Sequence, residues 1–406
     1  MPDKTYRVYP YRWVILAMFM LINLAIQILW ICYAPITGPA AKYYGVSDLQ
    51  IGFLAMSFMV VYLPLSIPIS WLIDTLGYRK AVNIGALLMA GFALMRGVFA
   101  ADYNGVLIAT LGLAVAQPFM LNAVSTVAAK WFPIEERATA SGLAIVANFI
   151  GTAIGQVTAP LLVLSYGIPA MNLFYGVVAA VCALLFVVFT REAPPTPPCP
   201  PGQEGRALVL DGLKSMLKMR DIWLLLALFL VGMGVFNGVS TWIEDIVRPR
   251  GFSITDAGSL GAFLLLGGTV GAIVIPLISD RLRKRKIFLL LGMLLAAPGL
   301  VGFTFASDYT LVVISMLWLG FFLMSLGPIG YQYAAEITYP APEGTSNGLL
   351  NLAGQASVVF IFAMEAFKNP DGSFTSSLLI QVVLLAACGL LVIALNESRL
   401  IHAGAE

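Results

Sequence analysis

Charged side chains are scarce in this sequence of 406 residues. Asp, Glu, Lys and Arg make up 11% of the chain and hydrophobic residues 60%, whereas soluble domains carry about 25% charged residues. A soluble globular protein, a disordered chain and a collagen-like chain are therefore excluded. The formal net charge is only +2, which argues against a nucleic-acid-binding protein.

Histidine and patterned cysteines are missing as well. The single histidine, His402, lies almost at the C-terminus, which disfavours a His-based proton relay, a His-ligated metal site and a Ser-His or Cys-His enzyme. The four cysteines, Cys32, Cys182, Cys199 and Cys388, have neither metal-ligand nor redox spacing. We therefore expect no metal, no cofactor and no catalytic centre.

Long apolar runs dominate what is present. A membrane-spanning helix needs about 20 mostly apolar residues, and the first run, after Arg12, is too long for a cleavable signal peptide. Twelve runs qualify: 12–33, 50–73, 80–100, 105–130, 138–163, 168–190, 221–243, 256–279, 286–306, 309–334, 345–367 and 374–396. The sequence predicts an all-α protein that crosses the membrane twelve times.

The basic residues predict the orientation. Eighteen of the 23 Lys and Arg residues fall on the side of the termini and four on the other side. Because cytoplasmic loops are enriched in Lys and Arg, we expect both termini in the cytoplasm and the chain in the cell membrane. A Pro-rich stretch at 191–220 separates six spans at 1–190 from six at 221–406, so we expect two six-helix bundles joined by a cytoplasmic linker.

The two halves also repeat each other. Charged residues match at a constant offset of 206 residues: Asp74 with Asp280, Arg79 with Arg285, and Lys80 with Lys286. A parallel six-helix repeat is the arrangement of major facilitator transporters. The segment at 74–80 also resembles that superfamily's D-x-x-G-[RY]-[RK]-[RK] signature, whereas the second copy keeps the charges and loses the Gly. We expect these residues to form gating ion pairs; the alternative is that the bases only enforce topology.

Polar side chains inside the spans are the candidate substrate contacts, because such groups are costly in a bilayer. Each amide has an alternative role in hydrogen bonding between helices, Trp30 as an interfacial residue, and Met59 in ordinary packing. The candidates are Gln27, Trp30, Met59, Gln117, Asn148, Asn237 and Gln355.

Two charged residues near span ends, Arg96 and Glu244, are candidates for the outer entrance of the transport pathway. Arg96 either attracts anions in a vestibule or extends to the membrane interface, and Glu244 either concentrates cations or is a solvated loop charge. No carboxylate lies in the middle of spans 1, 4, 5 or 8. This favours facilitated diffusion over proton coupling, and an organic solute over a bare ion.

Longer segments resemble one branch of the superfamily, the feline leukaemia virus subgroup C receptor-related transporters of solute carrier family 49. These segments are Leu29-Trp30-Ile31-Cys32-Tyr33, Met59-Val60-Val61-Tyr62-Leu63-Pro64-Leu65, Asn148-Phe149-Ile150-Gly151-Thr152 and Ala334-Ala335-Glu336-Ile337-Thr338-Tyr339-Pro340. The resemblance covers approximately residues 12–360. It implies the major facilitator fold and transport of choline, ethanolamine or haem.

The resemblance also implies roles for single residues. Trp30 would be a cation–π platform for an ammonium group, Gln117 and Gln355 polar contacts, and Asn148 and Met59 part of the wall. One departure is Asn237, which stands where the family has a tyrosine, so that a second aromatic wall is lost.

Three classes of function compete. A membrane-embedded enzyme would need a nucleophile–base pair, a metal cluster or an acid pair, and none is visible. A receptor would not need the symmetric repeat. We therefore expect a monomeric transporter of a small organic amine working by alternating access, with an ion-coupled organic-anion transporter or a haem transporter as the alternatives.

Overall fold

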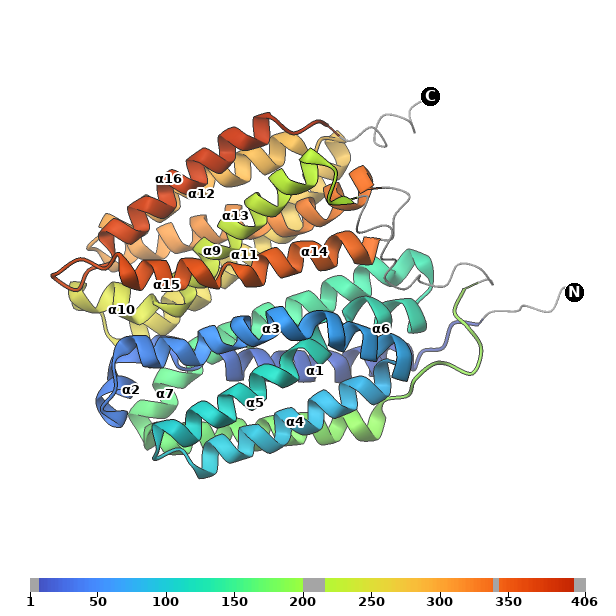
Figure 1. The fold of residues 1–406 in the computed structure, drawn as a ribbon, viewed down its shortest axis with the longest axis horizontal. Coiled ribbons are helices and arrows are strands. Elements are labelled where there is room, and N and C mark those ends of the chain that lie inside the picture. The colour runs from blue at the N-terminus through green and yellow to red at the C-terminus, as the bar shows by residue number, and fades with distance from the viewer. Residues whose placement is uncertain (1–6, 200–215, 339–342, 398–406) are drawn as a thin grey trace, which may run out of the picture. The chain divides into compact units, whose positions relative to one another are not determined.

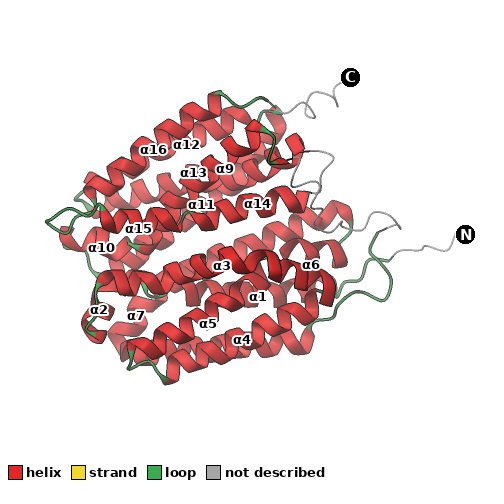
Figure 2. Ribbon diagram, in the orientation of Figure 1, coloured by secondary structure: helices red, strands yellow, loops and turns green. Residues whose placement is uncertain are grey.

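The computed structural model describes residues 7–199, 216–338 and 343–397. The chain divides into two compact units, residues 1–207 and 208–406. Each unit is a bundle of long helices (Figure 1), and the described residues contain no strand (Figure 2). Part of the predicted linker at 191–220, as well as His402, lies outside the described residues.

Unit 1 contains the six predicted spans of the first half, one of them broken into two helices and two of them fused into one. Its elements are α1 (Arg12–Ile31), η1 (Ala34–Ile36), α2 (Thr37–Tyr44), α3 (Asp48–Leu76), α4 (Tyr78–Val98), α5 (Tyr103–Leu121), α6 (Val124–Trp131) and α7 (Ile134–Phe189).

Unit 2 follows the same plan with different breaks. Its elements are α9 (Arg220–Thr241), α10 (Ile243–Val247), η2 (Arg248–Arg250), α11 (Ile254–Leu282), α12 (Lys286–Phe305), α13 (Tyr309–Thr338), α14 (Glu343–Ala356), α15 (Val358–Ala366) and α16 (Thr375–Ile393).

Within the described residues, eleven helical segments are long and apolar enough to cross a membrane. The predicted runs at 138–163 and 168–190 fall together in α7, whose 56 residues would extend about 84 Å if straight, far beyond a hydrocarbon core of about 30 Å. The helix is interrupted at Gly167, where φ is 83° and ψ is 168°. Gly167 therefore separates two spans that have no loop between them.

The fourth span is broken instead of fused. α5 ends at Leu121 and α6 begins at Val124. At this break the side-chain amide of Asn122 donates to Ser66 O and to Ser70 Oγ, each at 3.0 Å, while its oxygen accepts from the Tyr62 hydroxyl at 2.6 Å. These bonds join the broken helix to α3 and leave the Asn122 side chain fully paired.

In unit 2 the eleventh span is broken at Ser357, between α14 and α15. The Asn237 amide on α9 donates to Ser357 Oγ at 3.1 Å, and the Trp242 indole N–H donates to Ile361 O at 3.0 Å. α9 thus supplies hydrogen bonds on both sides of this break.

The 206-residue repeat extends to the ends of the helices. A left-handed glycine precedes the second span in each unit, Gly45 with φ 66° and Gly251 with φ 82°. Each is followed by a capping box in which a serine and the residue three positions later bond each other's backbone. The pairs are Ser47 with Gln50 and Ser253 with Asp256.

A second repeated contact closes the C-terminus of the third span. In unit 1 the Tyr44 hydroxyl donates to Ala100 O at 2.9 Å. In unit 2 the matching residue, Arg250, donates to Ala306 O at 3.0 Å, and burial lowers the pKa of Arg250 to about 10 because desolvation disfavours the charged form. Different side chains therefore satisfy the same terminal carbonyl.

The beginning of the predicted linker packs on unit 1. Pro197 O accepts from Arg7 N at 3.0 Å, and the Thr196 hydroxyl lies 3.2 Å from the Tyr9 hydroxyl. The Arg137 guanidinium donates to Cys199 Sγ at 3.3 Å, and Cys199 is buried. Residues up to Cys199 thus belong structurally to the first bundle.

We predict that Gly167→Ala lowers the free energy of unfolding by about 1–3 kcal/mol, because the backbone conformation at Gly167 is strained for any residue with a Cβ. Thermal unfolding of the purified protein measures this. Gly142→Ala is the matched control: Gly142 lies in the same helix, has ordinary helical geometry and has nothing within 4 Å of the added carbon, so alanine should be neutral or stabilising there. Equal melting temperatures for the two variants would contradict the assignment of Gly167 as a break.

Candidate functional site

The predicted substrate-contact residues divide between the two units. Gln27, Trp30, Met59, Gln117 and Asn148 belong to unit 1. Asn237 and Gln355 belong to unit 2. Five of the candidates thus lie in the first bundle and two in the second.

In unit 1 the Trp30 ring is held between α1 and α3. Its indole N–H donates to Ala55 O at 3.2 Å, and the side chain is 8% exposed. Met59 lies one turn beyond Ala55 on α3 and is buried, so it shares a helix face with the carbonyl that anchors the indole. Because the N–H is occupied, the ring can offer a ligand its π face.

The faces of α1 and α7 are brought together by two small residues. A Cβ on Gly151 would lie 2.4 Å from Leu24 O, and one on Gly155 would lie 3.2 Å from Ile28 Cα. The two helices therefore pack backbone to backbone, which is the purpose of small residues in membrane bundles. Asn148 lies one turn before Gly151 on this packed side of α7.

Amide oxygens without partners concentrate in unit 1. Buried amide oxygens that have no hydrogen-bond donor among the described residues include those of Asn23, Gln27, Asn83, Gln117, Asn148 and Asn172. Asn23, Gln27 and Trp30 follow one another at helical spacing on α1, so they form one stripe of that helix. Unit 1 therefore presents hydrogen-bond acceptors and an aromatic face. Such a site suits an organic cation that also carries hydrogen-bond donors.

In unit 2 the two candidates differ in their surroundings. Asn237 is 4% exposed and donates to Ser357, so it contributes to the break in the eleventh span. Gln355 is half-buried on α14, two residues before that break. Asn237 thus has a structural partner, whereas the Gln355 side chain makes no hydrogen bond within the described part of the chain.

The expected vestibule charges are not exposed. Arg96 is fully buried on α4, where it donates to Leu29 O at 2.9 Å and to Cys32 Sγ at 3.4 Å. Its guanidinium also lies 5.7 Å from the centre of the Tyr33 ring. Since a cation next to the last carbonyls of a helix is favourable, Arg96 stabilises the C-terminal turn of α1, next to Trp30. An open anion-attracting vestibule does not fit this burial.

Glu244 likewise is buried, at 4% exposure, and its carboxylate accepts from Arg248 Nε at 2.8 Å. The same arginine pairs with Asp245. This acidic pair is thus neutralised locally by an arginine one turn away, which differs from the expectation of a cation-concentrating charge.

The first copy of the predicted gating motif is organised by a residue that the sequence analysis missed. Glu192 Oε2 accepts from Arg79 N at 2.8 Å at the beginning of α4, and Glu192 also pairs with Lys130. Asp74 and Lys80 are exposed, and Asp74 has no hydrogen bond or ion pair in the described ranges. The acid that closes the motif within unit 1 is therefore Glu192.

The second copy is centred on Arg285. Its guanidinium pairs with Asp280 and, at 3.0 Å, with Glu336, and its backbone N–H donates to Glu397 at 2.9 Å. Arg285 and Glu336 side chains are 8% and 9% exposed. Glu192 and Glu397 each follow the last span of their bundle, but they are one residue off the 206-residue repeat, so a search at constant offset could not pair them.

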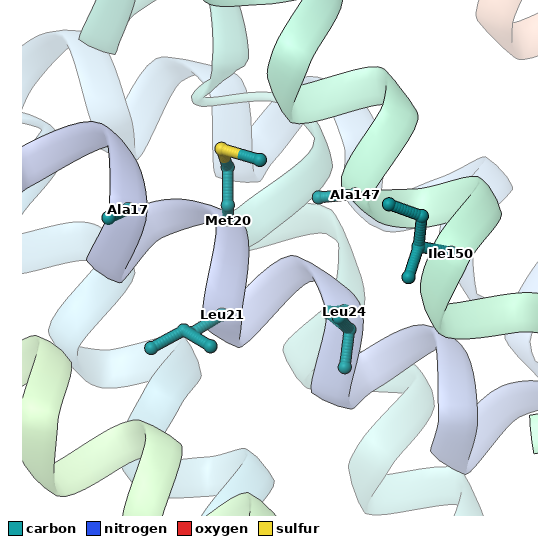
Figure 3. A pocket seen from close by; sticks show the side chains of 6 residues that line it. All are labelled: Ala17, Met20, Leu21, Leu24, Ala147 and Ile150. Carbon is teal, nitrogen blue, oxygen red and sulfur yellow. The ribbon is translucent and has the colours of Figure 1, made fainter. Parts of the chain in front are cut away.

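A pocket of about 300 Å³ lies elsewhere in unit 1, between α1 and α7 (Figure 3). It is lined only by aliphatic side chains and methionine: Ala17, Met20, Leu21, Leu24, Ala147 and Ile150. With no polar side chain to bind a charged group, this pocket is suited to hydrocarbon and does not coincide with the polar candidates. Within the described residues, no cluster of three or more His, Cys, Asp or Glu side chains could hold a metal ion.

Comparison with known proteins identifies the family. The Major Facilitator Superfamily profile matches residues 14–363. The chain belongs to the Major Facilitator Superfamily. The predicted all-α major facilitator fold is thereby confirmed, and the protein is a multi-pass membrane transporter that handles a small molecule.

Two relatives illustrate the branch. Solute carrier family 49 member A3 of Danio rerio is 31% identical, with 91% of this chain and 81% of that protein aligned. The choline/ethanolamine transporter FLVCR1 of Felis catus is also 31% identical, with 96% of this chain and 73% of that protein aligned. The resemblance to this family seen in the sequence segments is confirmed.

A solved structure with the same fold is a bacterial homologue of the human lysosomal transporter Spinster. The TM-score is 0.76 at 17% identity, over 98% of this chain and 99% of that one. At this identity the likeness concerns the fold alone.

We predict that Arg285→Gln lowers the free energy of unfolding by about 3 kcal/mol, because it leaves the poorly exposed Glu336 carboxylate without its cation. Chemical or thermal unfolding in detergent measures the change. Arg281→Gln is the control, since Arg281 lies near Arg285, in the last turn of α11, but is exposed. This substitution should change the free energy of unfolding by less than about 0.5 kcal/mol. A similar loss in both variants would show that the effect comes from net charge.

Proposed function

We propose that this protein transports a small organic amine, such as choline or ethanolamine, by facilitated diffusion and alternating access. The observation that carries the proposal is the set of unpaired buried amide oxygens in unit 1, two of which, on Asn23 and Gln27, share a stripe of α1 with Trp30. The hydroxyl group of either amine and the primary ammonium of ethanolamine supply the donors that these oxygens lack, and an aromatic face attracts the cationic group of both. The names of the relatives, choline/ethanolamine transporters among them, support the same substrate class.

The organic-anion alternative loses its main support. Arg96, the charge invoked to attract an anion, is directed at Leu29 O and Cys32 Sγ. A carboxylate substrate would also face acceptor oxygens and would leave them unpaired. No observation in the structure specifically favours haem, so the amine is the function that we propose.

In this proposal Trp30 is the cation–π platform, Gln27, Gln117 and Gln355 are polar contacts, and Asn148, Met59 and Asn237 form the wall. The protein works as a monomer in the cell membrane. Both termini lie in the cytoplasm, an orientation that the distribution of Lys and Arg favours. Neither an enzyme activity nor a cofactor is part of the mechanism.

We predict that proteoliposomes containing the protein take up radiolabelled choline or ethanolamine down their gradients without an imposed ion gradient. Trp30→Leu should raise KM about tenfold, because a cation–π contact contributes about 0.5–2 kcal/mol, whereas Trp30→Phe should keep part of the affinity. Trp318→Leu is the control, since Trp318 is 45% exposed on unit 2, and its KM should be unchanged. Absence of amine uptake by the unaltered protein would reject the function itself.

We further propose that Asp74, Arg79, Lys80, Asp280 and Arg285 control the exchange between access states. The Asp74 carboxylate makes no hydrogen bond or ion pair within the described part of the chain, so it is available for a contact formed in one access state. Charge-assisted bonds of this kind stabilise one state over another only if they differ between the states.

We predict that Asp74→Asn changes the exchange rate of alternating access by severalfold without lowering the melting temperature. Cysteine-accessibility labelling and single-turnover uptake measure the two access states. Asp371→Asn, in an exposed turn of unit 2, is the control and should transport normally. Unchanged transport together with unchanged labelling in Asp74→Asn would leave Asp74 with no gating role.

A further inference from the structure

The turn between α11 and α12 exposes three bases and a leucine. Arg281, Arg283 and Lys284 are all exposed, and Leu282 between them is 58% exposed. Within the described residues no carboxylate pairs with any of the three bases. A group of three like charges with an apolar side chain in its centre is therefore presented at the end of a membrane-spanning helix.

The neighbouring acids are already engaged by other groups. Asp280 and Glu336 pair with Arg285, and Glu397 accepts from the backbone N–H groups of Arg285 and Lys286. Lys286 itself donates to Ile393 O at 2.6 Å. The charge network around Arg285 is thus closed, and no acid within the described residues compensates the positive charge of the outer three residues.

The first copy of the motif shows that the fold does not require these bases. Gly77 occupies the position that matches Arg283, and a Cβ there would lie 2.6 Å from a Glu192 oxygen. Gly77 has φ 85° and ψ 151°, whereas Arg283 lies in the left-handed region with φ 50° and ψ 43° and is the one non-glycine residue with a positive φ in the described ranges. A left-handed arginine is less favourable than glycine at such a position, and the Arg283 side chain makes no hydrogen bond or ion pair among the residues that the structure describes.

An apolar stripe leads to this turn along α11. Leu266 is 56%, Val270 46%, Ile273 51% and Leu277 55% exposed, and their spacing places them along one side of the helix, with Arg281 one turn beyond Leu277. Exposed apolar side chains on a membrane helix contact acyl chains. Bases next to them lie at the level of the headgroups.

We propose that the turn at 281–284 binds the headgroup of an anionic phospholipid whose acyl chains lie along the α11 stripe. Basic residues beside a membrane helix attract anionic lipid headgroups, and arginine donates to phosphate oxygens through two parallel N–H groups. The apolar stripe identifies the partner as a lipid, since a soluble acidic protein would have no use for exposed aliphatic side chains on a spanning helix.

The test uses the full chain in neutral detergent, with dioctanoyl phosphatidylglycerol as the probe and dioctanoyl phosphatidylcholine and inorganic phosphate as comparisons. We expect binding, measured by thermal shift and thermophoresis, to be at least tenfold tighter for phosphatidylglycerol than for either comparison. Arg281→Gln/Lys284→Gln should weaken phosphatidylglycerol binding at least tenfold, since each base near the headgroups contributes about fivefold. Lys218→Gln/Arg220→Gln removes the same charge from another exposed part of unit 2 and should change binding less than twofold.

Arg283→Gly separates binding from folding. Glycine relieves the left-handed backbone, so the lipid-free variant should melt at a higher temperature than the unaltered protein while binding phosphatidylglycerol about fivefold more weakly. A merely structural role of Arg283 would not give these opposite changes. Equal affinity for the two lipids, equal affinity for phosphate, or an equal loss in the Lys218/Arg220 control would each overturn the proposal.

Discussion

Helix ends and helix breaks need hydrogen-bond partners, and in a bilayer water cannot supply them. Most of the long-range polar contacts described above serve this need. Asn122 pairs at the break before α6, Asn237 at the break after α14, and Tyr44 and Arg250 close matching helix ends in the two units. These four polar side chains thus lie where the backbone is interrupted.

This constraint also explains Arg96. A fully buried guanidinium without a carboxylate would be unfavourable in an apolar bundle, but here it meets the terminal carbonyl of Leu29 and the ring of Tyr33. The turn that it stabilises is also the turn that carries Trp30. The geometry of the proposed platform therefore depends on an electrostatic contact made from a different helix.

The number, order and approximate bounds of the spans could be predicted, because length and hydropathy alone determine which segments cross a bilayer. The breaks at Asn122 and Ser357 could not, since a polar residue inside an apolar run has the same sequence signature whether the helix continues or stops. The burial of Arg96 and Glu244 could not be predicted for a related reason. The partner of Arg96 is a backbone atom, Leu29 O, and the partner of Glu244 is Arg248, which lies between the predicted runs 221–243 and 256–279.

Part of what was missed did have a signal. Ser47 and Ser253, and Asp102 and Asp308, obey the 206-residue offset and cap equivalent helices, so a search of polar matches outside the charged motif would have found them. Glu192 and Glu397 fill similar places one residue out of register. Their equivalence is visible in the contacts of the folded chain and not in the alignment of its halves.

The break at Gly167 has a consequence for how the protein is made. With no loop between the two halves of α7, the segments on either side have to enter the bilayer as one helical hairpin, since no polar stretch is available to hold the first at the surface while the second emerges from the ribosome. For the same reason the turn is too short for an inserted glycosylation site or protease site. The side of the membrane on which it lies therefore has to be determined from sites in the neighbouring loops.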